Sequence, residues 1–144
     1  MDVDALARRL IEEMPDAVVV ADAEGVICIW NEGAERIFGF SRAEAIGKSL
    51  DIITPENLRA RHWEGYRRTM STGKTKYGAG DLLSVPATHK DGRRISVQFT
   101  VLPLSNPDGS LSGIAAVMRD ITKDFDERKA LMMELTELRR RSVG

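Results

Sequence analysis

Few side chains in this sequence are suited to metal or nucleophilic chemistry: one cysteine, Cys28, and two histidines, His62 and His89, among 144 residues. A single cysteine cannot form an intramolecular disulfide, and the three side chains together fall short of an ordinary structural zinc site. Cys28 lies between Ile27 and Ile29 in a run typical of a strand, so we expect a buried, unreactive thiol. His89 falls in an expected turn and should be solvated, which leaves His62 as the histidine of interest.

Motifs of catalytic and phosphate-binding sites are incomplete. The segment 47–49 (Gly-Lys-Ser) ends like a Walker A loop, but the glycine required five residues earlier is Arg42. Gly78 and Gly80 lack the third glycine of a dinucleotide-binding fingerprint, because a leucine stands at that position. No serine-hydrolase elbow, zinc-peptidase histidine pair or kinase block accompanies them, so we do not expect an enzyme.

Composition argues against several other classes of protein. The chain has 21 Lys and Arg against 22 Asp and Glu, a formal net charge of −1, which disfavours a direct nucleic-acid binder. The longest apolar run, 17–21, is far shorter than the roughly 20 residues of a membrane-spanning helix, and the N-terminus lacks a signal-peptide pattern. We expect a cytoplasmic protein with a single main domain and no membrane contact.

The first half of the chain is predicted to form two strands and then short helices. The β-branched runs 17–21 and 26–30 flank a short turn and predict a hairpin. Helical spacing follows over 31–51, where Gly39 should end one helix and the capping box 41–44 should begin another.

The helix that carries His62 is predicted to begin at Thr54 and to end at Gly73. Thr54 is the expected N-cap, and Pro55 suits the first helical position because proline lacks a backbone N–H group. This helix would connect the first hairpin to a second group of strands.

Three further strands are predicted at 81–87, 94–104 and 111–119, joined by turns at 90–92 and 106–109. In the middle strand, apolar and polar residues alternate, so one face should lie against the core. The apolar positions are Ile95, Val97, Phe99 and Val101.

Amphipathic helices are predicted at both ends of the chain, over 4–14 and 124–141. In the second, Leu131, Leu135 and Leu138 recur at spacings of four and three. A small domain cannot cover both apolar stripes, so we expect a homodimer in which a second copy covers them. Alternatively, the first helix folds back on its own sheet and the last is solvated.

A set of short motifs runs in a characteristic order from about residue 14 to residue 122. The motifs are Ala17 to Asp22, Ile29-Trp30-Asn31, Phe38-Gly39-Phe40, Lys90-Asp91-Gly92, Asp108-Gly109 and Arg119-Asp120-Ile121-Thr122. This order resembles the PAS sensory-domain family. The resemblance implies an α+β PAS fold, a five-stranded antiparallel sheet in the order 2-1-5-4-3 with short helices on one face. It divides the chain into an N-terminal helix (1–14), a PAS domain (15–122) and a C-terminal signalling helix (123–144).

Within that family, the segment around His62 is similar to the haem-binding PAS domains of bacterial oxygen-sensor kinases and phosphodiesterases. In those domains, a helix histidine at this spacing before a Thr-Gly pair, here Thr72-Gly73, is the proximal iron ligand. The resemblance therefore implies haem bound to His62, the one metal ligand expected. A histidine without a ligand is the alternative. Flavin is disfavoured, because the reactive cysteine of flavin-binding relatives belongs to a helical motif that Cys28 does not match.

The resemblance also implies a cofactor pocket between the sheet and the helices. Its expected lining is Tyr66, Leu82, Leu83, Val85, Phe99, Ile114 and Val117. Oxygen sensors of this type carry an arginine on the distal side, where this chain has the segment 80–83 (Gly-Asp-Leu-Leu). The distal side should therefore be apolar, and carbon monoxide, nitric oxide or redox sensing stand beside oxygen sensing.

Asp120 and Thr122 are expected to relay the signal from the sheet to the exit helix, although a simple strand-ending cap is an equal alternative. The function implied is a signal-sensing module of bacterial-type, two-component signal transduction. Its effector would be a fused or separate histidine kinase or transcription regulator. The alternative is a cofactor-free PAS module for protein interaction and dimerisation, or a sensor of another small molecule.

Overall fold

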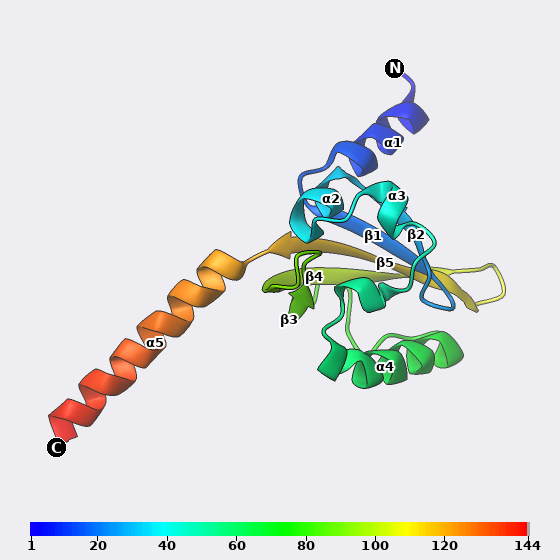
Figure 1. Ribbon diagram of the computed structural model, residues 1–144. Coiled ribbons are helices and arrows are strands. Elements are labelled where there is room, and N and C mark those ends of the chain that lie inside the picture. The colour runs from blue at the N-terminus through cyan, green and yellow to red at the C-terminus, as the bar shows by residue number, and fades with distance from the viewer. Residues whose placement is uncertain (144) are drawn as a thin grey trace.

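The computed structural model describes residues 1–143 and contains a five-stranded antiparallel sheet with helices along one face (Figure 1). The sheet order is β2-β1-β5-β4-β3, which is the order that the sequence resemblance predicts. The two halves of the chain meet where β1 pairs with β5. The strands are β1 (Ala17–Asp22), β2 (Ile27–Trp30), β3 (Leu83–Thr88), β4 (Arg94–Ser105) and β5 (Leu111–Asp120).

Short helices fill the crossover between β2 and β3, and longer ones lie at both chain ends. The helices are α1 (Val3–Glu13), α2 (Glu32–Phe38), α3 (Arg42–Ala45), α4 (Arg59–Thr72) and α5 (Thr122–Val143). As predicted, Gly39 ends α2 in a left-handed conformation and the capping box of Ser41 and Glu44 begins α3. Gly144, the last residue assigned to the C-terminal helix, lies outside the described residues.

The start of α4 differs from the prediction. Residues Glu56–Leu58 form a separate 3₁₀ turn, and α4 begins at Arg59. Thr54 does not cap α4, because its hydroxyl donates to the carbonyl oxygen of Leu50, 2.9 Å away, in the preceding turn. The predicted end is correct, since Gly73 has φ +74° and terminates α4.

The core lies between the sheet and α2, α3 and α4. Strand register places the alternating apolar residues of four strands on this inner face. The predicted alternation in β4 is confirmed at Ile95 and Val97, both of which are buried. The inner-face residues of β1, β4 and β5 are Ala17, Val19, Ala21, Ile95, Val97, Phe99, Val101, Ile114, Ala116 and Met118.

One buried amide anchors α1 to this core. Asn31 is only 1% exposed, and its Oδ1 accepts hydrogen bonds from the backbone N–H groups of Val18 and Ala34. The amide nitrogen donates to the carbonyl oxygens of Ile11, Met14 and Asp16. These bonds fix the C-terminal end of α1 and the residue directly before β1, although no residue of α1 itself is buried.

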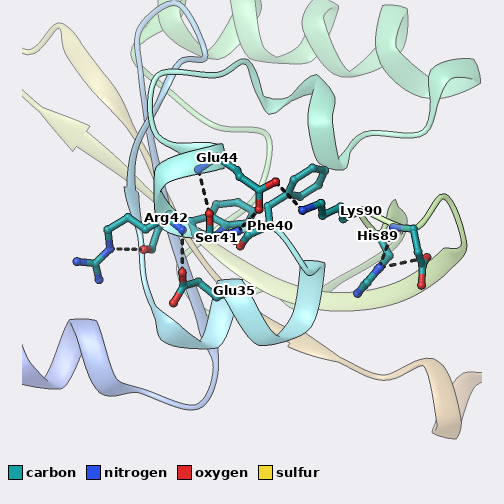
Figure 2. Close-up of polar contacts among 9 residues, drawn as sticks. Glu35, Phe40, Ser41, Arg42, Glu44, His89 and Lys90 are labelled. Carbon is teal, nitrogen blue, oxygen red and sulfur yellow. Dashed lines mark hydrogen bonds and ion pairs between the residues drawn. The ribbon is translucent and has the colours of Figure 1, made fainter.

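A polar junction, which we define as Ser41, Glu44 and Lys90, ties the start of α3 to the β3–β4 hairpin (Figure 2). The Nζ of Lys90 lies 2.6 Å from Oε2 of Glu44, and the backbone N–H of Lys90 donates to the carbonyl of Phe38. The Lys90 ammonium, together with the capping contacts of Ser41, lowers the pKa of Glu44 to about 2. The junction joins two segments that are 46 residues apart in sequence.

Candidate functional site

His62 lies on α4 in a cluster of aromatic rings. The centroid of its imidazole is 4.8 Å from that of Trp63 and 5.9 Å from that of Tyr66. Its Nδ1 atom is enclosed and, within residues 1–143, has no hydrogen-bond partner. A buried polar atom without a partner costs about 1–3 kcal/mol, so a ligand that engages this imidazole would relieve the cost.

The surroundings of His62 favour the neutral form of its imidazole. Burial lowers its pKa, and the carboxylate of Asp51 opposes that shift only in part. A neutral imidazole retains a nitrogen lone pair, which is what coordination of a metal ion requires. The donor chemistry of His62 therefore fits the iron of a haem group.

Trp63 and Tyr66 fix α4 to the rest of the domain. The indole Nε1 of Trp63 donates to Oδ1 of Asp51 over 2.7 Å, and the hydroxyl of Tyr66 donates to the carbonyl of Asp22 over 2.5 Å. The Trp63 ring covers Gly25 so closely that a Cβ there would lie 2.2 Å from the ring. Burial raises the pKa of Tyr66, so its hydroxyl keeps its proton. These contacts orient the turn of α4 that carries His62.

Some of the predicted lining residues come together on the inner face. Phe99 and Ile114 are half-buried and pack against the core, where Tyr66 is buried. Leu83 pairs with Phe99 in the β3–β4 register and is also half-buried. Tyr66, Leu83, Phe99 and Ile114 thus lie on the side of the sheet that the helices cover.

Three other predicted lining residues do not belong to an enclosed pocket. Leu82 precedes β3 and is 64% exposed. Val117 pairs with Val18 and is 40% exposed. Side chains alternate along β5, and the odd-numbered positions face away from the helices. Val85 shares the register of Val97 but lies on the edge strand β3 and is 38% exposed.

Two hollows of the surface also lie elsewhere. One, of about 650 Å³, runs along Leu6 and Leu10 of α1. A second, of about 420 Å³, lies between Ile11 of α1 and Ile29 of β2. Neither includes His62, and beneath α4 the inward-facing side chains pack against the core. A large cofactor would therefore have to displace α4 outward.

The expectations for Cys28 and His89 need correction. Cys28 is exposed rather than buried, because the short strand β2 turns it away from the core. Partial desolvation and nearby Asp22 raise the pKa of its thiol, which keeps it protonated. The side chain of His89 is only 15% exposed, since its ring lies over Gly39 and its Nδ1 accepts from the backbone N–H of Asp91.

The exit from the sheet is built from Asp120 and Thr122. Oδ1 of Asp120 accepts from the hydroxyl and the backbone N–H of Thr122, at 2.5 and 2.9 Å. The Thr122 hydroxyl oxygen in turn accepts from the backbone N–H of Ser96 on β4, 3.0 Å away. The first turn of α5 is therefore bonded both to β5 and to its neighbouring strand.

Sequence reasoning missed two connections near this exit. Arg119 forms an ion pair with Asp16, in which Nη2 of the arginine lies 3.1 Å from Oδ2 of the aspartate. The two residues are 103 positions apart in sequence, so local spacing cannot reveal the contact. The role of Asn31 was also missed, although an asparagine directly before a helical segment indicates an N-cap.

Comparison with known proteins defines the family. Residues 11–124 match the family model described as PAS fold, and the chain belongs to that family. It is a PAS sensory domain of the kind found in signal-transduction proteins.

Two relatives with assigned roles are sensors. The chain is 30% identical to the sensor protein FixL of Bradyrhizobium diazoefficiens over 128 residues, which cover 89% of this chain and 25% of FixL. It is 28% identical to the oxygen sensor protein DosP of Escherichia coli over 120 residues, covering 83% of this chain and 14% of DosP. The chain thus spans a quarter or less of the length of these relatives.

Solved structures agree on the fold. The PAS domain of a protein from Colwellia psychrerythraea superposes with a TM-score of 0.72 at 24% identity, covering 85% of this chain and 99% of that one. An RNA-binding light-oxygen-voltage receptor gives a TM-score of 0.74 at 18% identity, covering 93% and 37%. Among residues 1–143, no helix has the length and apolar character needed to cross a bilayer.

Proposed function

We propose that this PAS domain binds haem through His62 and senses a diatomic gas or a change of redox state. The observation that carries the proposal is the enclosed, unpartnered Nδ1 of a neutral imidazole on α4. The similarity to a protein named as an oxygen sensor supports the same class of signal. Bound haem would supply an iron centre that can bind a diatomic gas or change its oxidation state.

The residues of this chain would orient and shield the group. Trp63 and Tyr66 set the orientation of the α4 turn that presents His62, and the apolar side chains of Phe99 and Ile114 exclude water on the sheet side. Tyr66 is the one residue of α4 that is buried, and Trp63 and Met70 pack partly buried against the core, so outward movement of α4 would expose their apolar surface. Binding at this site would therefore be coupled to the position of α4.

We further propose that Asp120 and Thr122 relay the change to α5. Asp120 accepts from Thr122, and the bond of Thr122 to Ser96 joins α5 to β4, the strand that also carries Phe99, so a shift of the inner face would reach the first turn of α5. The exposed apolar residues of α1 and α5 would form a homodimer. The partner would be a histidine kinase or transcription regulator, on the same chain or on a separate one.

Titration with haem tests the proposal. Purified protein should develop a Soret band that saturates at one haem per chain, and His62→Ala should remove or shift that band. His89→Asn is the matched control, because it removes the other imidazole while the asparagine Oδ1 can still accept from the Asp91 N–H group. A wild-type protein without a Soret band would exclude haem, and an unchanged band in His62→Ala would exclude His62 as the ligand.

A cofactor-free interaction module is the second candidate. It is favoured by the packed interior beneath α4 and by α1 and α5, none of whose residues is buried. Mass spectrometry of the purified protein separates the candidates, because a module of this kind carries no small molecule and assembles to the same extent with and without added haem. A co-purifying flavin or other compound would instead identify a different sensor.

A further inference from the structure

Residues 59–76, which form α4 and the start of the loop after it, are strongly basic. They hold six Lys and Arg residues against one acid, Glu64, in a chain whose formal net charge is −1. Two of the six have partners, since Arg59 donates to backbone carbonyl oxygens and Arg68 lies 3.0 Å from Glu64. The fold leaves the other positive charges without a counter-charge. Within residues 1–143, no ion pair is formed by Arg61, Arg67, Lys74 and Lys76.

The unpaired cations lie on the side of α4 that faces away from the sheet. Trp63, Tyr66 and Met70 recur at helical spacing and pack against the core, whereas Arg61 and Arg67 are exposed. In the view of Figure 1, no other element of residues 1–143 lies beyond α4 on that outer side. The core therefore takes up the apolar positions of α4, and the outer side of the helix is polar and cationic.

Gly65 opens a gap in the middle of this outer side. It is exposed, and a Cβ there would meet nothing within 4 Å. Arg61 and Arg68 flank it on the same face of the helix, four residues before and three residues after. Arg68 is 67% exposed despite its pair with Glu64, so it retains donors for a second carboxylate. A partner chain can therefore approach the helix backbone between two guanidinium groups, each able to bind a carboxylate through two parallel hydrogen bonds.

We propose that this surface docks an acidic segment of a partner protein. The surface, which we call the basic face of α4, consists of Arg61, Arg67, Arg68, Lys74 and Lys76. Carboxylates supply the complementary charge, and such complementarity favours encounter and sets orientation. A bilayer fits less well, because helices that lie on membranes bury an apolar face, and the apolar face of α4 is in the core. Nucleic acid also fits less well, because the rest of the chain is net acidic. The proposal does not depend on haem.

The direct test measures binding of a fluorescent peptide of alternating glutamate and alanine to the full chain by anisotropy. The same peptide with glutamine in place of glutamate is the control. We expect the glutamate peptide alone to bind, and its affinity to fall as salt is added, because salt shortens the range of charge interactions. Vesicles of phosphatidylcholine with phosphatidylglycerol and a single-stranded DNA are measured alongside. Tighter binding of either would overturn the assignment of a protein partner, and no binding of the glutamate peptide would overturn the docking site.

Charge-removing variants locate the site on the molecule. Arg61→Gln with Arg67→Gln removes two unpaired cations and should weaken peptide binding about 2- to 30-fold, the range of two exposed ion pairs. Lys129→Gln with Arg139→Gln removes the same charge from α5, which extends away from the domain, and should leave the affinity unchanged (Figure 1). Equal weakening by the two double variants would show that only net charge matters and would overturn the proposal.

A pair of substitutions at Gly65 tests the gap between the two arginines. Gly65→Glu places a carboxylate beside Arg61 and Arg68, where it would compete with the peptide, and Gly65→Gln adds a side chain of the same size without the charge. Both residues favour a helix more than glycine does, and circular dichroism checks that both variants fold. We expect Gly65→Glu to bind the peptide more weakly than Gly65→Gln. Equal affinities of the two variants would contradict the proposal.

Discussion

Asn31 illustrates how a single buried amide determines the direction of an exposed helix. Its three donated and two accepted hydrogen bonds join the end of α1, the start of β1 and the start of α2. Gly33, the second residue of α2, permits this close packing, since a Cβ there would lie 2.1 Å from the carbonyl oxygen of Asp16. The orientation of α1 is thus specified by polar contacts rather than by apolar burial.

Replacing Asn31 should therefore lower the stability of the folded domain. Asn31→Leu removes every contact and leaves enclosed backbone groups without partners, so we expect a loss of about 3 kcal/mol in the free energy of unfolding, measured by urea denaturation. Asn31→Asp retains the acceptor but not the donor, and it should release α1 while the amide of Ala34 stays protected from hydrogen exchange. Unchanged protection throughout α1 in Asn31→Asp would show that the donor contacts are unimportant.

Glu44 of the polar junction should give the domain a specific acid sensitivity. Its pKa is about 2 in the folded chain, against 4.5 as the usual value, so the folded state favours the ionised form. The resulting stabilisation is complete above pH 4.5 and is lost as the pH falls from 4.5 towards 2.

Unfolding curves of the wild type and of Glu44→Gln, measured at intervals over this pH range, test the expectation. The difference in stability between the two proteins should shrink as the pH falls, because only the wild type loses an ionised partner for Lys90. A difference that stays constant from pH 6 to pH 2.5 would contradict the role assigned to the pair.

At the level of elements, α4 is the least embedded of the helices between β2 and β3, because Tyr66 is the one buried residue among its fourteen. Its anchors are the Trp63 and Tyr66 side chains, which contact Asp51 and the β1–β2 hairpin. The view in Figure 1 shows α4 standing off the strands more than α2 and α3 do. Within this crossover, local opening should therefore begin at α4.

Tyr66→Phe tests this description of α4. Loss of the hydroxyl leaves the carbonyl of Asp22 without that donor and should destabilise the domain by about 1 kcal/mol. Hydrogen exchange should accelerate over α4 and remain unchanged in β4 and β5. Tyr77→Phe is the control, because Tyr77 is exposed and its hydroxyl makes no side-chain bond within the described residues.

The sequence predicted elements better than it predicted which way individual side chains point. Gly39, the capping box at Ser41 and Gly73 are local signals, and they mark helix ends correctly. The start of α4 was wrong because a 3₁₀ turn and a helix have similar spacing over three residues.

The site was predicted only in part, for reasons that concern pairing. Val117 was assigned to the pocket lining, but its face is set by its alignment with Val18 on β1, a strand that is distant in sequence. The exposure of Cys28 and the enclosure of His89 likewise depend on tertiary neighbours. The orphaned nitrogen of His62 is a property of the folded interior, which spacing along the chain does not describe.

For the whole molecule, the exposed apolar residues of α5 predict self-association. Light scattering should give twice the 16.0 kDa of the single chain. Substituting Leu131, Leu135 and Leu138 together by glutamine should shift the mass to that of a monomer, since these side chains form one stripe at spacings of four and three. A matched variant with Lys129 and Thr136 replaced by glutamine should remain a dimer. A monomeric wild type at high concentration would contradict the prediction.

The chain enters the sheet on β1 and leaves it on β5, and these two strands are direct neighbours. Ala17 at the start of β1 pairs with Met118 near the end of β5, and the Asp16–Arg119 ion pair closes the gap just outside them. A polypeptide that passes through this fold therefore departs close to where it arrived. Such a domain can be spliced into a longer protein, or removed from it, with little change in the path of the flanking segments.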